Sequence, residues 1–499
     1  MRKAIETSGG WRFRSKLMTG MKPTNLVFII SDEHRRDAAG CYGNEVIQTP
    51  NLDRLAERGT RFTNAYTNSP ICVPARACLA SGRHIFETGH WDNAFPYYGE
   101  PEGWGHTLKA ADHICDSVGK LHYRKAEDDN GFREEIDAMY VAEGIGEIIS
   151  CLRERTPSRQ GRGDIVKAGP GDSAYLRYDA TTTAEACRWI SDHASDDRPW
   201  VLFVSLVCPH PPFTAPQDCY DLYSHDDVPL PVHWEQKDWP SHPALEYFRE
   251  HFGWTEPLNE VELRRVTATY YALTTYVDQN VGKLLGTLEA SSASDNTRIV
   301  YTSDHGAMIG ARGLFGKFQM YDDSAAIPMI VAGPDVPESN VVSTPVSLID
   351  CPPTILESVG LQPQPDLSGE SLWRLATEPD STRTVLSEYH AAGTRHGISM
   401  ITDGQYKYIH YCHESPQLFD LESDPSELHD LSELPEHQAT RSTYEQKLRD
   451  ILDPEAVDAH AKADQLAKVE AFGGEEAVIA RGLSNSPVPG EKPVFRHFN

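Results

Sequence analysis

Short apolar runs alternate along this chain with segments whose apolar residues recur at helical spacing. Four runs are continuous enough to be strands buried on both faces, which is typical of a parallel sheet. Their alternation with helical segments predicts a doubly wound α/β fold. The predicted strands are Asn25–Ser31, Trp200–Val207, Thr297–Thr302 and Ile327–Ala332, and the predicted helices are Asn51–Arg58, Ala75–Ser81, Ala180–Ser195, Val261–Leu288 and Val346–Val359.

Polar side chains that could act as catalytic groups or metal ligands follow three of these strands. The first strand runs into Asp32-Glu33-His34, the second into Cys208-Pro209-His210, and the third into Ser303-Asp304-His305. In open α/β sheets, binding sites form in the crevice beyond the carboxyl ends of the strands. We therefore expect carboxylates and imidazoles from three strands to meet at one edge of the sheet.

The pattern changes after about residue 380, where short alternating segments predict a small antiparallel sheet over Thr384–Tyr389, Gly397–Ile401 and Tyr406–His410. A helical pattern follows at Thr443–Leu452. The predicted organisation is a disordered leader (1–22), a main α/β domain (23–378), a small C-terminal antiparallel-sheet and helix subdomain (379–472) and an extended tail (473–499).

The composition and net charge of the chain limit the kinds of molecule that it could bind. An apolar fraction of 39% and a charged fraction of 24% in 499 residues are those of a soluble globular protein. The net charge of −28 would repel nucleic acid and anionic membranes, so neither is expected as a partner. An anionic substrate would have to be held by a local cluster of cations.

Ten cysteines are scattered along the chain without zinc-like pairs, which indicates a reducing compartment rather than a disulfide framework. The first 22 residues contain no apolar run typical of a secretory signal. No segment approaches the roughly 20 apolar residues that a membrane span needs. We therefore expect a cytoplasmic protein.

Cys72 opens the segment Cys72-Val73-Pro74-Ala75-Arg76, which small residues continue at helical spacing. Pro74 suits the first turn of a helix, and the amino end of that helix favours negative charge beside residue 72. This Cys-x-Pro-x-Arg resembles the modification motif of type I sulfatases, in which an enzyme oxidises the cysteine to formylglycine. The hydrated aldehyde then attacks the sulfur of a sulfate ester.

The resemblance to the sulfatase branch of the alkaline phosphatase superfamily runs from about Asn25 to Asp424. It implies an α/β fold with a large mixed, mostly parallel sheet flanked by helices and a smaller C-terminal α+β subdomain. Besides Cys72–Arg76, the motifs that carry it are Asp32-Glu33, Gly119-Lys120-Leu121-His122, His210, Asp304-His305 and Gly316-Lys317.

By this resemblance, the polar residues take defined roles around the hydrate at position 72. Arg76 would steady it, His122 would orient it, and His210 would protonate the leaving oxygen. Positive groups would hold the sulfate oxygens where negative charge develops. These groups are Lys120, His210 and Lys317.

A divalent metal is the implied cofactor. Carboxylates at two strand ends supply the oxygen ligands that hard cations prefer, and a histidine nitrogen is compatible with calcium and suits manganese. Calcium is therefore expected, with manganese as the alternative. Glu33 stands where many relatives have Asp, and its extra methylene makes it a weaker candidate than Asp32. The candidate ligands are Asp32, Glu33, Asp304, His305 and the modified Cys72.

Aromatic and acidic residues later in the chain are candidates for binding the rest of the substrate. Their segments resemble choline sulfatases and phosphonate monoester hydrolases, and an aromatic ring beside carboxylates could cage a quaternary ammonium group. Ordinary aromatic packing between subdomains is the competing interpretation. The candidates are Trp91, Asp92, Asn93 and Glu388.

Together these features predict a formylglycine-dependent sulfuric ester hydrolase that acts on a small organic sulfate and needs a formylglycine-generating maturation enzyme as a partner. A phosphonate monoester or phosphodiester hydrolase with the same site is one alternative, and an unmodified pseudoenzyme serving as a binding module is another. Phe495–Phe498 is an apolar anchor at the C-terminus, so we also expect a homo-oligomer paired through the tails.

Overall fold

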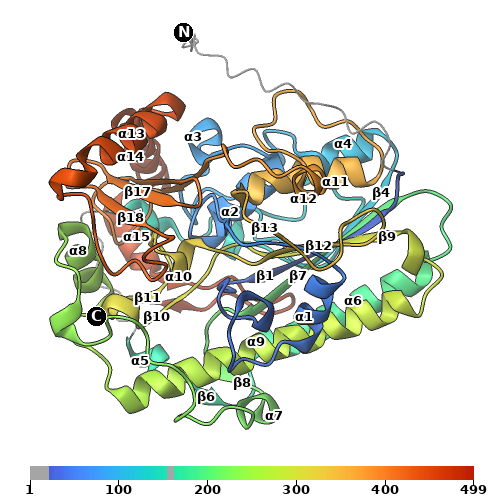
Figure 1. Cartoon of the computed structure of the whole chain (residues 1–499), viewed down its shortest axis with the longest axis horizontal. Helices are drawn as coiled ribbons and strands as arrows, with labels where there is room; N and C mark the ends of the chain where they lie inside the picture. The colour runs from blue at the N-terminus through green and yellow to red at the C-terminus, as the bar shows by residue number, and fades with distance from the viewer. Residues whose placement is uncertain (1–21, 154–161, 499) are drawn as a thin grey trace.

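An eight-stranded sheet with the strand order β13-β2-β12-β9-β1-β7-β4-β5 forms the centre of the molecule (Figure 1). The structure is a computed structural model that describes residues 22–153 and 162–498. Of the predicted leader, all but residue 22 lies outside the described residues. The strands are β1 (Asn25–Asp32), β2 (Gly59–Phe62), β4 (Ile114–Lys120), β5 (Glu134–Met139), β7 (Trp200–Pro209), β9 (Thr297–Ser303), β12 (Met329–Ala332) and β13 (Asn340–Val342).

The sheet is mixed and mostly parallel, as predicted. Strand β12 is antiparallel to both its neighbours, β9 and β2, whereas the other neighbouring strands pair in parallel. The prediction that Ile327–Ala332 belongs to a parallel arrangement is therefore wrong. Parallel neighbours need a crossover, usually a helix. Only short elements lie between β9 and β12, the longest being the four-residue helix α10 (Asp322–Ala325).

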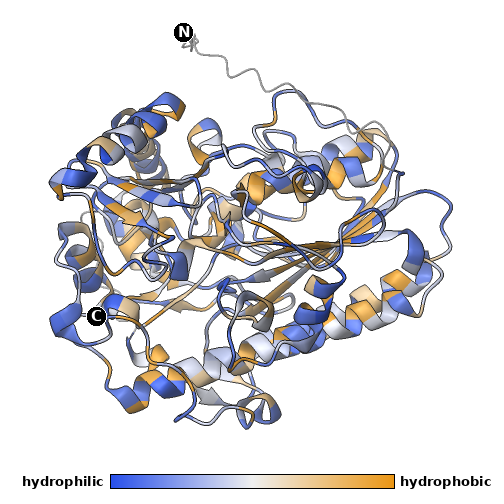
Figure 2. Cartoon of the chain, viewed as in Figure 1, coloured by the Kyte–Doolittle hydropathy of each residue, from blue (hydrophilic) through white to orange (hydrophobic). Residues whose placement is uncertain are grey.

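Both faces of the central strands are buried, which explains their continuous apolar sequences. In β1, Leu26, Phe28 and Ile30 pack into one apolar cluster, whereas Val27 and Ile29 pack into another. The hydropathy colouring shows these apolar strands between amphipathic helices (Figure 2). Helices α1 (Pro50–Glu57), α6 (Ala174–His193) and α9 (Glu260–Glu289) cover one face, and α2 (Cys72–Ser81), α4 (Trp104–Ala110), α11 (Cys351–Ser358) and α12 (Leu372–Thr377) cover the other.

The predicted helix Val346–Val359 is shorter than expected. The structure places a short strand, β14 (Val346–Ser347), and a 3-10 turn before helix α11 begins at Cys351. Pro352 and Pro353 explain the start, because proline fits the first turn of a helix but not its interior. Strand β4 escaped prediction because the buried polar residues Asp116 and Ser117 interrupt its apolar run.

The C-terminal part forms a second, four-stranded antiparallel sheet. Its strands are β15 (Val385–Tyr389), β16 (Ile398–Thr402), β17 (Tyr406–Tyr411) and β18 (Gln417–Asp420), paired in sequence order. Helices α13 (Gln438–Ile451) and α14 (Pro454–Phe472) follow. The remaining short elements are β3 (Ala65–Tyr66), α3 (Ile85–Thr88), α5 (Arg162–Ile165), β6 (Gly169–Pro170), α7 (Gln217–Tyr220), β8 (Thr214–Ala215), α8 (Pro243–Phe252), β10 (Met308–Ile309) and β11 (Phe315–Gly316).

The last segment is more structured than the predicted extended tail. It contains helix α15 (Glu475–Arg481) and a pair of short antiparallel strands, β19 (Leu483–Ser484) and β20 (Phe495–Arg496). Val478 and Phe498 pack into an apolar cluster formed with the 3-10 turn Ile148–Cys151. This segment therefore folds back onto the main domain.

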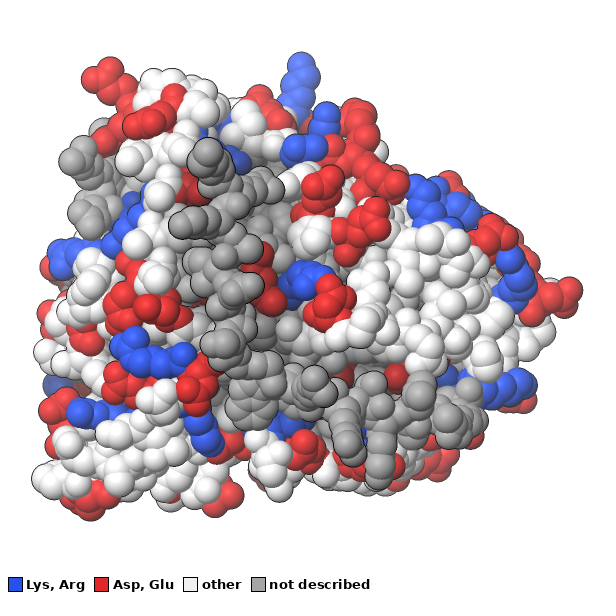
Figure 3. Space-filling view, turned by 90° about the horizontal axis from the view of Figure 1, so that it is seen from above, with Lys and Arg blue, Asp and Glu red and all other residues white. Residues whose placement is uncertain are grey.

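Acidic side chains are spread over the face seen in Figure 3, with basic ones interspersed among them, as expected for a net charge of −28. Within the described parts of the chain, no helix combines the length and the apolar character that crossing a membrane requires. All ten cysteines are free.

Candidate active site

The residues expected at the sheet edge come together there. Asp32 is the last residue of β1, Lys120 is the last residue of β4, and Asp304 directly follows β9. These strands and β7 are consecutive in the sheet, so their carboxyl ends open into one crevice. Helix α2 carries Cys72 into the same crevice as its first residue.

Cys72 lies at the centre of the site, in contact with three other polar side chains. Its Sγ lies 3.1 Å from Lys317 Nζ, 3.2 Å from His305 Nε2 and 3.6 Å from Asp32 Oδ1, and the residue is 2% exposed. Burial, aided by the charge of Asp32, raises the pKa of the thiol to about 12. An unmodified Cys72 is therefore protonated and a poor nucleophile at neutral pH.

Arg76 lies one helical turn after Cys72 and holds two strand ends together. Its Nε donates to Asp304 Oδ2 at 2.8 Å, and its Nη2 donates to Asp32 Oδ2 at 3.3 Å. Its Nη1 donates to the carbonyl of Lys120 at 2.7 Å and to Ser205 Oγ at 2.9 Å. The guanidinium thus fixes the spacing of both carboxylates.

Four side chains could hold a cation. Ligand atoms of Asp32, Cys72, Asp304 and His305 all lie within 4.8 Å of one another, and all four residues are buried. Burial raises the pKa of Asp32, but the charge of Lys120, with smaller contributions from other nearby cationic groups, outweighs this and holds it well below its usual value. Asp32 is therefore ionised, as a metal ligand must be.

His305 presents the correct nitrogen to this cluster. Its Nδ1 is 2.9 Å from the carbonyl oxygen of Gly306, which must accept the hydrogen bond, so Nε2 directs a lone pair towards Cys72. Burial lowers the pKa of His305, which keeps the ring neutral. A neutral imidazole fixed by a carbonyl is the form in which histidine binds metals.

Glu33 stands beside this four-residue group rather than within it. It groups instead with Asp32 and His210. Its Oε2 accepts from Lys317 Nζ at 2.9 Å, and its buried Oε1 has no hydrogen-bond partner within the described chain. Burial raises the pKa of Glu33. Its backbone φ of 70° is left-handed, a strained conformation that often marks functional sites.

Two buried lysines bring positive charge into the crevice. Lys120 Nζ donates to Asp32 Oδ2 at 2.5 Å. Burial lowers the pKa of Lys317, but the neighbouring Cys72, Glu33 and Asp32 outweigh burial and raise it well above the usual value. Lys317 is therefore a permanent cation beside residue 72.

Two histidines lie near these lysines in the crevice. His210 Nδ1 lies 2.6 Å from the carbonyl oxygen of Pro211, and Nε2 lies 3.7 Å from Glu33 Oε2. Burial and the charge of Lys317 hold the pKa of His210 well below its usual value. Burial, together with the charge of Lys120, lowers the pKa of His122 in the same way. Both rings are thus neutral in the free site.

Ser486 is a site residue that the sequence did not indicate. Its Oγ lies 2.6 Å from His122 Nε2, and its carbonyl accepts from the hydroxyl of Tyr175 at 3.4 Å. The Tyr175 ring packs edge-on against His210. Ser486 lies 364 residues after His122 in a segment of unremarkable composition, so no local signal links the two.

The predicted substrate-binding residues divide into two groups. Asn93 Oδ1 accepts from the backbone N–H of Val73, next to the nucleophile position. Trp91 and Asp92 contact α14, through Asp464 Oδ2 at 2.8 Å and Gln465 Nε2 at 2.6 Å respectively. Of these three residues, only Asn93 forms a hydrogen bond to a residue adjacent to position 72.

Glu388, the fourth of these residues, is fully buried. Its carboxylate lies 3.3 Å from His390 Nε2, and its carbonyl accepts from Ser69 Oγ at 2.8 Å. The Trp91 ring packs edge-on against the same histidine. For Trp91, Asp92 and Glu388, contact with substrate stays a prediction.

Buried carboxylates, a cysteine at the first position of a helix and two cations at the carboxyl edge of a mixed α/β sheet are the arrangement expected of a hydrolase of anionic esters. The sulfatase family matches residues 24–361, and the chain belongs to this family. The region over residues 310–453 also matches the family described as N-sulphoglucosamine sulphohydrolase, C-terminal. The protein is thus a sulfatase, as predicted.

Its relatives include two kinds of sulfatase. A choline-sulfatase from Rhizobium meliloti (strain 1021) is 31% identical over 474 residues, with 90% of each chain covered. Arylsulfatase K from Danio rerio is 30% identical over 438 residues, covering 82% of this chain and 80% of the relative. Among solved structures, the phosphonate monoester hydrolase of Agrobacterium radiobacter has a TM-score of 0.70 at 22% identity, covering 95% of this chain and all of the other, which shows a shared fold.

Proposed function

We propose that this sulfatase hydrolyses a small organic sulfate ester with formylglycine at position 72 and a bound divalent cation. The observation that carries the proposal is the position of Cys72 Sγ, within 3.6 Å of a carboxylate, an imidazole and an ammonium group. Sγ stands where the oxygen of the modified residue would lie. The thiol itself has too high a pKa to be the nucleophile.

The described residues fit a divalent cation. Asp32, Asp304 and His305 supply two carboxylates and a neutral imidazole around one point, and the donor set is rich in oxygen, as calcium prefers. The unpartnered Oε1 of Glu33 leaves a further oxygen available at the edge of this group. When bound, such a cation acidifies an attached hydroxyl and screens developing negative charge.

Formylglycine supplies a hydrated aldehyde hydroxyl in place of the thiol, and installing it requires a maturation enzyme as a partner. The residues of this chain would do the rest. Arg76 holds Asp32 and Asp304 at fixed spacing, which preorganises the site. Lys120 and Lys317 would bind the non-bridging oxygens of the sulfate group, and the permanent charge of Lys317 suits that role.

His210 is the proposed proton donor for the leaving oxygen. Its ring is neutral in the free site because burial and Lys317 depress its pKa. A bound sulfate ester brings a negative charge next to the ring, which favours the protonated form. Its side chain is 20% exposed, compared with 8% for Lys317 and 4% for Lys120, so protons can reach it from solvent.

The choline-sulfatase relative supports a small substrate, and the arylsulfatase K relatives support other sulfate esters. We propose hydrolysis of a small organic sulfate. A phosphonate monoester or phosphodiester hydrolase is the alternative, supported by the fold shared with a phosphonate monoester hydrolase. The proposed homo-oligomer finds less support, because Phe498 packs against its own chain.

The test is a rate comparison on protein whose formylglycine content has been measured. The chain is produced with a formylglycine-generating enzyme, and mass spectrometry across Cys72 shows the loss of the thiol. Initial rates are then compared for choline sulfate, an aryl sulfate and a phosphonate monoester at equal concentration. We expect the highest kcat/KM on a sulfate ester. A higher value on the phosphonate would support the alternative, and an unmodified Cys72 would support the pseudoenzyme.

A further inference from the structure

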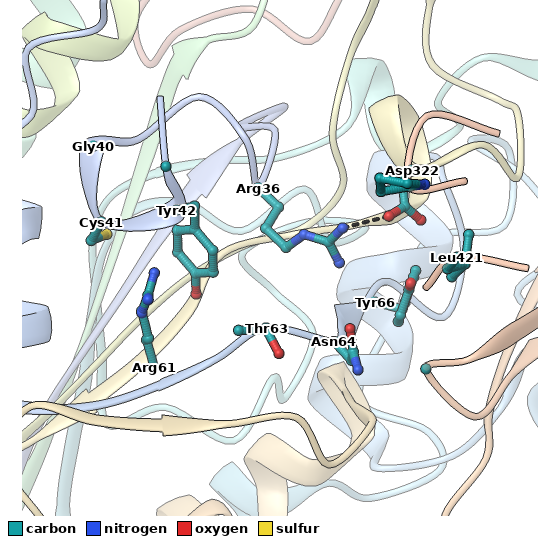
Figure 4. A pocket seen from close by; sticks show the side chains of 13 residues that line it. Arg36, Gly40, Cys41, Tyr42, Arg61, Thr63, Asn64, Tyr66, Asp322 and Leu421 are labelled. Carbon is teal, nitrogen blue, oxygen red and sulfur yellow. Dashed lines mark hydrogen bonds and ion pairs between the residues drawn. The ribbon is translucent and has the colours of Figure 1, made fainter. Parts of the chain in front are cut away.

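The charged groups of the cavity after β1 do not converge on one point (Figure 4). Arg36 forms an ion pair with Asp322, which lies at the start of α10. Arg61 lies on the other side of the Tyr42 ring. By contrast, the contact between Ser486 and His122 places a residue of the C-terminal segment directly against a group of the active site.

Residues 481–498 form a C-terminal hairpin that is fixed to the main domain near the crevice. Strands β19 and β20 pair within it. At its start, Arg481 Nη1 donates to the carbonyl of Gly146 at 2.6 Å. At its end, Phe498 packs against the 3-10 turn Ile148–Cys151. Both ends of the hairpin are therefore attached to the same part of the main domain.

The loop between the two strands has few backbone conformations open to it. Proline fixes its own φ and restricts the residue that precedes it. Ser486 directly precedes a proline, so its backbone favours extended conformations. Little conformational entropy is therefore lost when the loop stays against the crevice. The prolines of the loop are Pro487, Pro489 and Pro493.

The hairpin contacts His122 directly and also supports its backbone. Ser486 Oγ lies 2.6 Å from Nε2 of the His122 ring. The backbone N–H of His122 donates to the carbonyl of Met139 at 2.8 Å, and Val488 of the hairpin packs against the apolar cluster that contains Met139. The φ of His122 is 63°, a left-handed and strained conformation of the kind found at functional sites.

The two ring nitrogens of His122 have different surroundings. Nε2 has Ser486 as its partner, whereas Nδ1 is buried without a hydrogen-bond partner among the described residues. The neutral ring carries one proton, on one of these two nitrogens. A proton on Nδ1 would leave a buried N–H without an acceptor, which is rarer in proteins than an unpaired acceptor. This difference favours the tautomer protonated at Nε2, with Ser486 Oγ as the acceptor.

We propose that Ser486 is a positioning residue that holds His122 in the tautomer protonated at Nε2. Its half-buried hydroxyl accepts from Nε2 and can turn its own hydrogen towards solvent. The lone pair of Nδ1 is then available to accept a hydrogen bond from a hydroxyl group in the crevice. This last step rests on the proposed function, in which His122 orients the hydroxyl of formylglycine at position 72.

Nitrogen NMR of the full-length protein reads the tautomer directly. The protein is labelled with ¹⁵N-histidine, and the signals of His122 are identified by their loss in His122→Gln. Spectra that correlate ring protons with ring nitrogens then show which nitrogen carries the proton. The variants are Ser486→Ala and Ser486→Thr. Ser484→Ala is the matched control, because the Ser484 hydroxyl lies in the same hairpin and has no hydrogen-bond partner within the described chain.

We expect a protonated Nε2 and an unprotonated Nδ1 in the wild type, in Ser486→Thr and in Ser484→Ala. Ser486→Ala should move both nitrogen signals towards those of a mixture of tautomers. A proton on Nδ1 in the wild type, or His122 signals that are identical in the wild type and Ser486→Ala, would overturn the proposal. This measurement needs no formylglycine, so its outcome does not depend on the hydrolysis of any sulfate ester.

Kinetics on matured protein test the positioning role. Ser486→Ala should lower kcat about fivefold, the worth of one hydrogen bond, and change KM less than about twofold, because the charged groups that would bind the sulfate stay in place. Ser486→Thr keeps the hydroxyl and should retain most of the wild-type kcat, and Ser484→Ala should match the wild type. Equal kcat values in Ser486→Ala and Ser484→Ala would overturn the positioning role. A wild type that shows the Nε2 tautomer but hydrolyses no ester would contradict the proposed function and support the tautomer assignment.

Discussion

Lys317→Ala tests the cation that lies closest to the reacting position. The change removes an ammonium group 3.1 Å from Cys72 Sγ and 2.9 Å from Glu33 Oε2. The side chain is 8% exposed, and its pKa lies well above the usual value, so its charge is present at every working pH. No other side chain in the described site offers a cation this close to residue 72.

The expected size of the effect follows from these contacts. Removing one preorganised donor that faces developing negative charge costs about 100- to 1,000-fold in kcat. The change also leaves the buried Glu33 carboxylate without its ammonium partner, and breaking a buried ion pair destabilises a fold by about 3–5 kcal/mol. The two effects are separable, because kcat and KM can be measured well below the melting temperature of the variant.

The assay measures kcat and KM on a sulfate ester with formylglycine content matched by mass spectrometry. Lys109→Ala is the matched control, because Lys109 is 51% exposed and pairs with Asp129 at the surface. We expect kcat/KM to fall at least 100-fold for Lys317→Ala and less than about twofold for Lys109→Ala. A fall smaller than about threefold in folded, matured Lys317→Ala protein would refute the role given to Lys317.

Four further outcomes follow from the same structure. Cys72→Ala should abolish hydrolysis while the circular dichroism spectrum stays unchanged, and near-normal turnover would exclude the covalent role. Chelation should suppress activity, and restoration by calcium or by manganese would identify the ion; full activity after exhaustive chelation would contradict the metal site. Ser486→Ala should lower kcat/KM by about fivefold, the worth of one hydrogen bond. Because the change removes the hydrogen-bond partner of His122, it should also shift the acidic limb of the pH–rate profile. An unchanged profile would contradict a role for this hydrogen bond in catalysis. Burial raises the pKa of Asp179 to about 6, from an ordinary value of 3.8. The folded state therefore binds a proton at this carboxylate more tightly than the unfolded state does. This contribution to the free energy of unfolding is present below about pH 4 and is lost as the pH rises through 6, an amount of about 3 kcal/mol. Urea unfolding of wild type and Asp179→Asn at pH 4, 5, 6 and 7 measures it, and equal pH slopes would contradict it.

Much of the fold could be predicted because each central strand is buried on both faces. Such strands read as unbroken apolar runs, and β1, β7 and β9 were found within two residues of their observed ends. Strand β4 was missed because it buries Asp116, which pairs with Arg133 and accepts from the Trp189 indole. The carboxylate of Asp116 is satisfied by partners that no local pattern reveals.

The candidate site shows the same division. Asp32, Cys72 and Asp304 were predictable, because strand ends and a helix start have local signatures and because one edge of a parallel sheet gathers them. The approach of Ser486 to His122 was not predictable, because it depends on how the C-terminal segment packs against the main domain.

By itself, the sequence determined the α/β class and the set of chemical groups, because periodicity and short motifs are properties of neighbouring residues. Only the tertiary structure decided that Lys317 and His305 both reach Cys72, that β12 runs antiparallel, and that Trp91 is buried against α14. Those outcomes depend on distances between residues far apart along the chain. Such distances are set by the packing of whole elements, which no local pattern encodes.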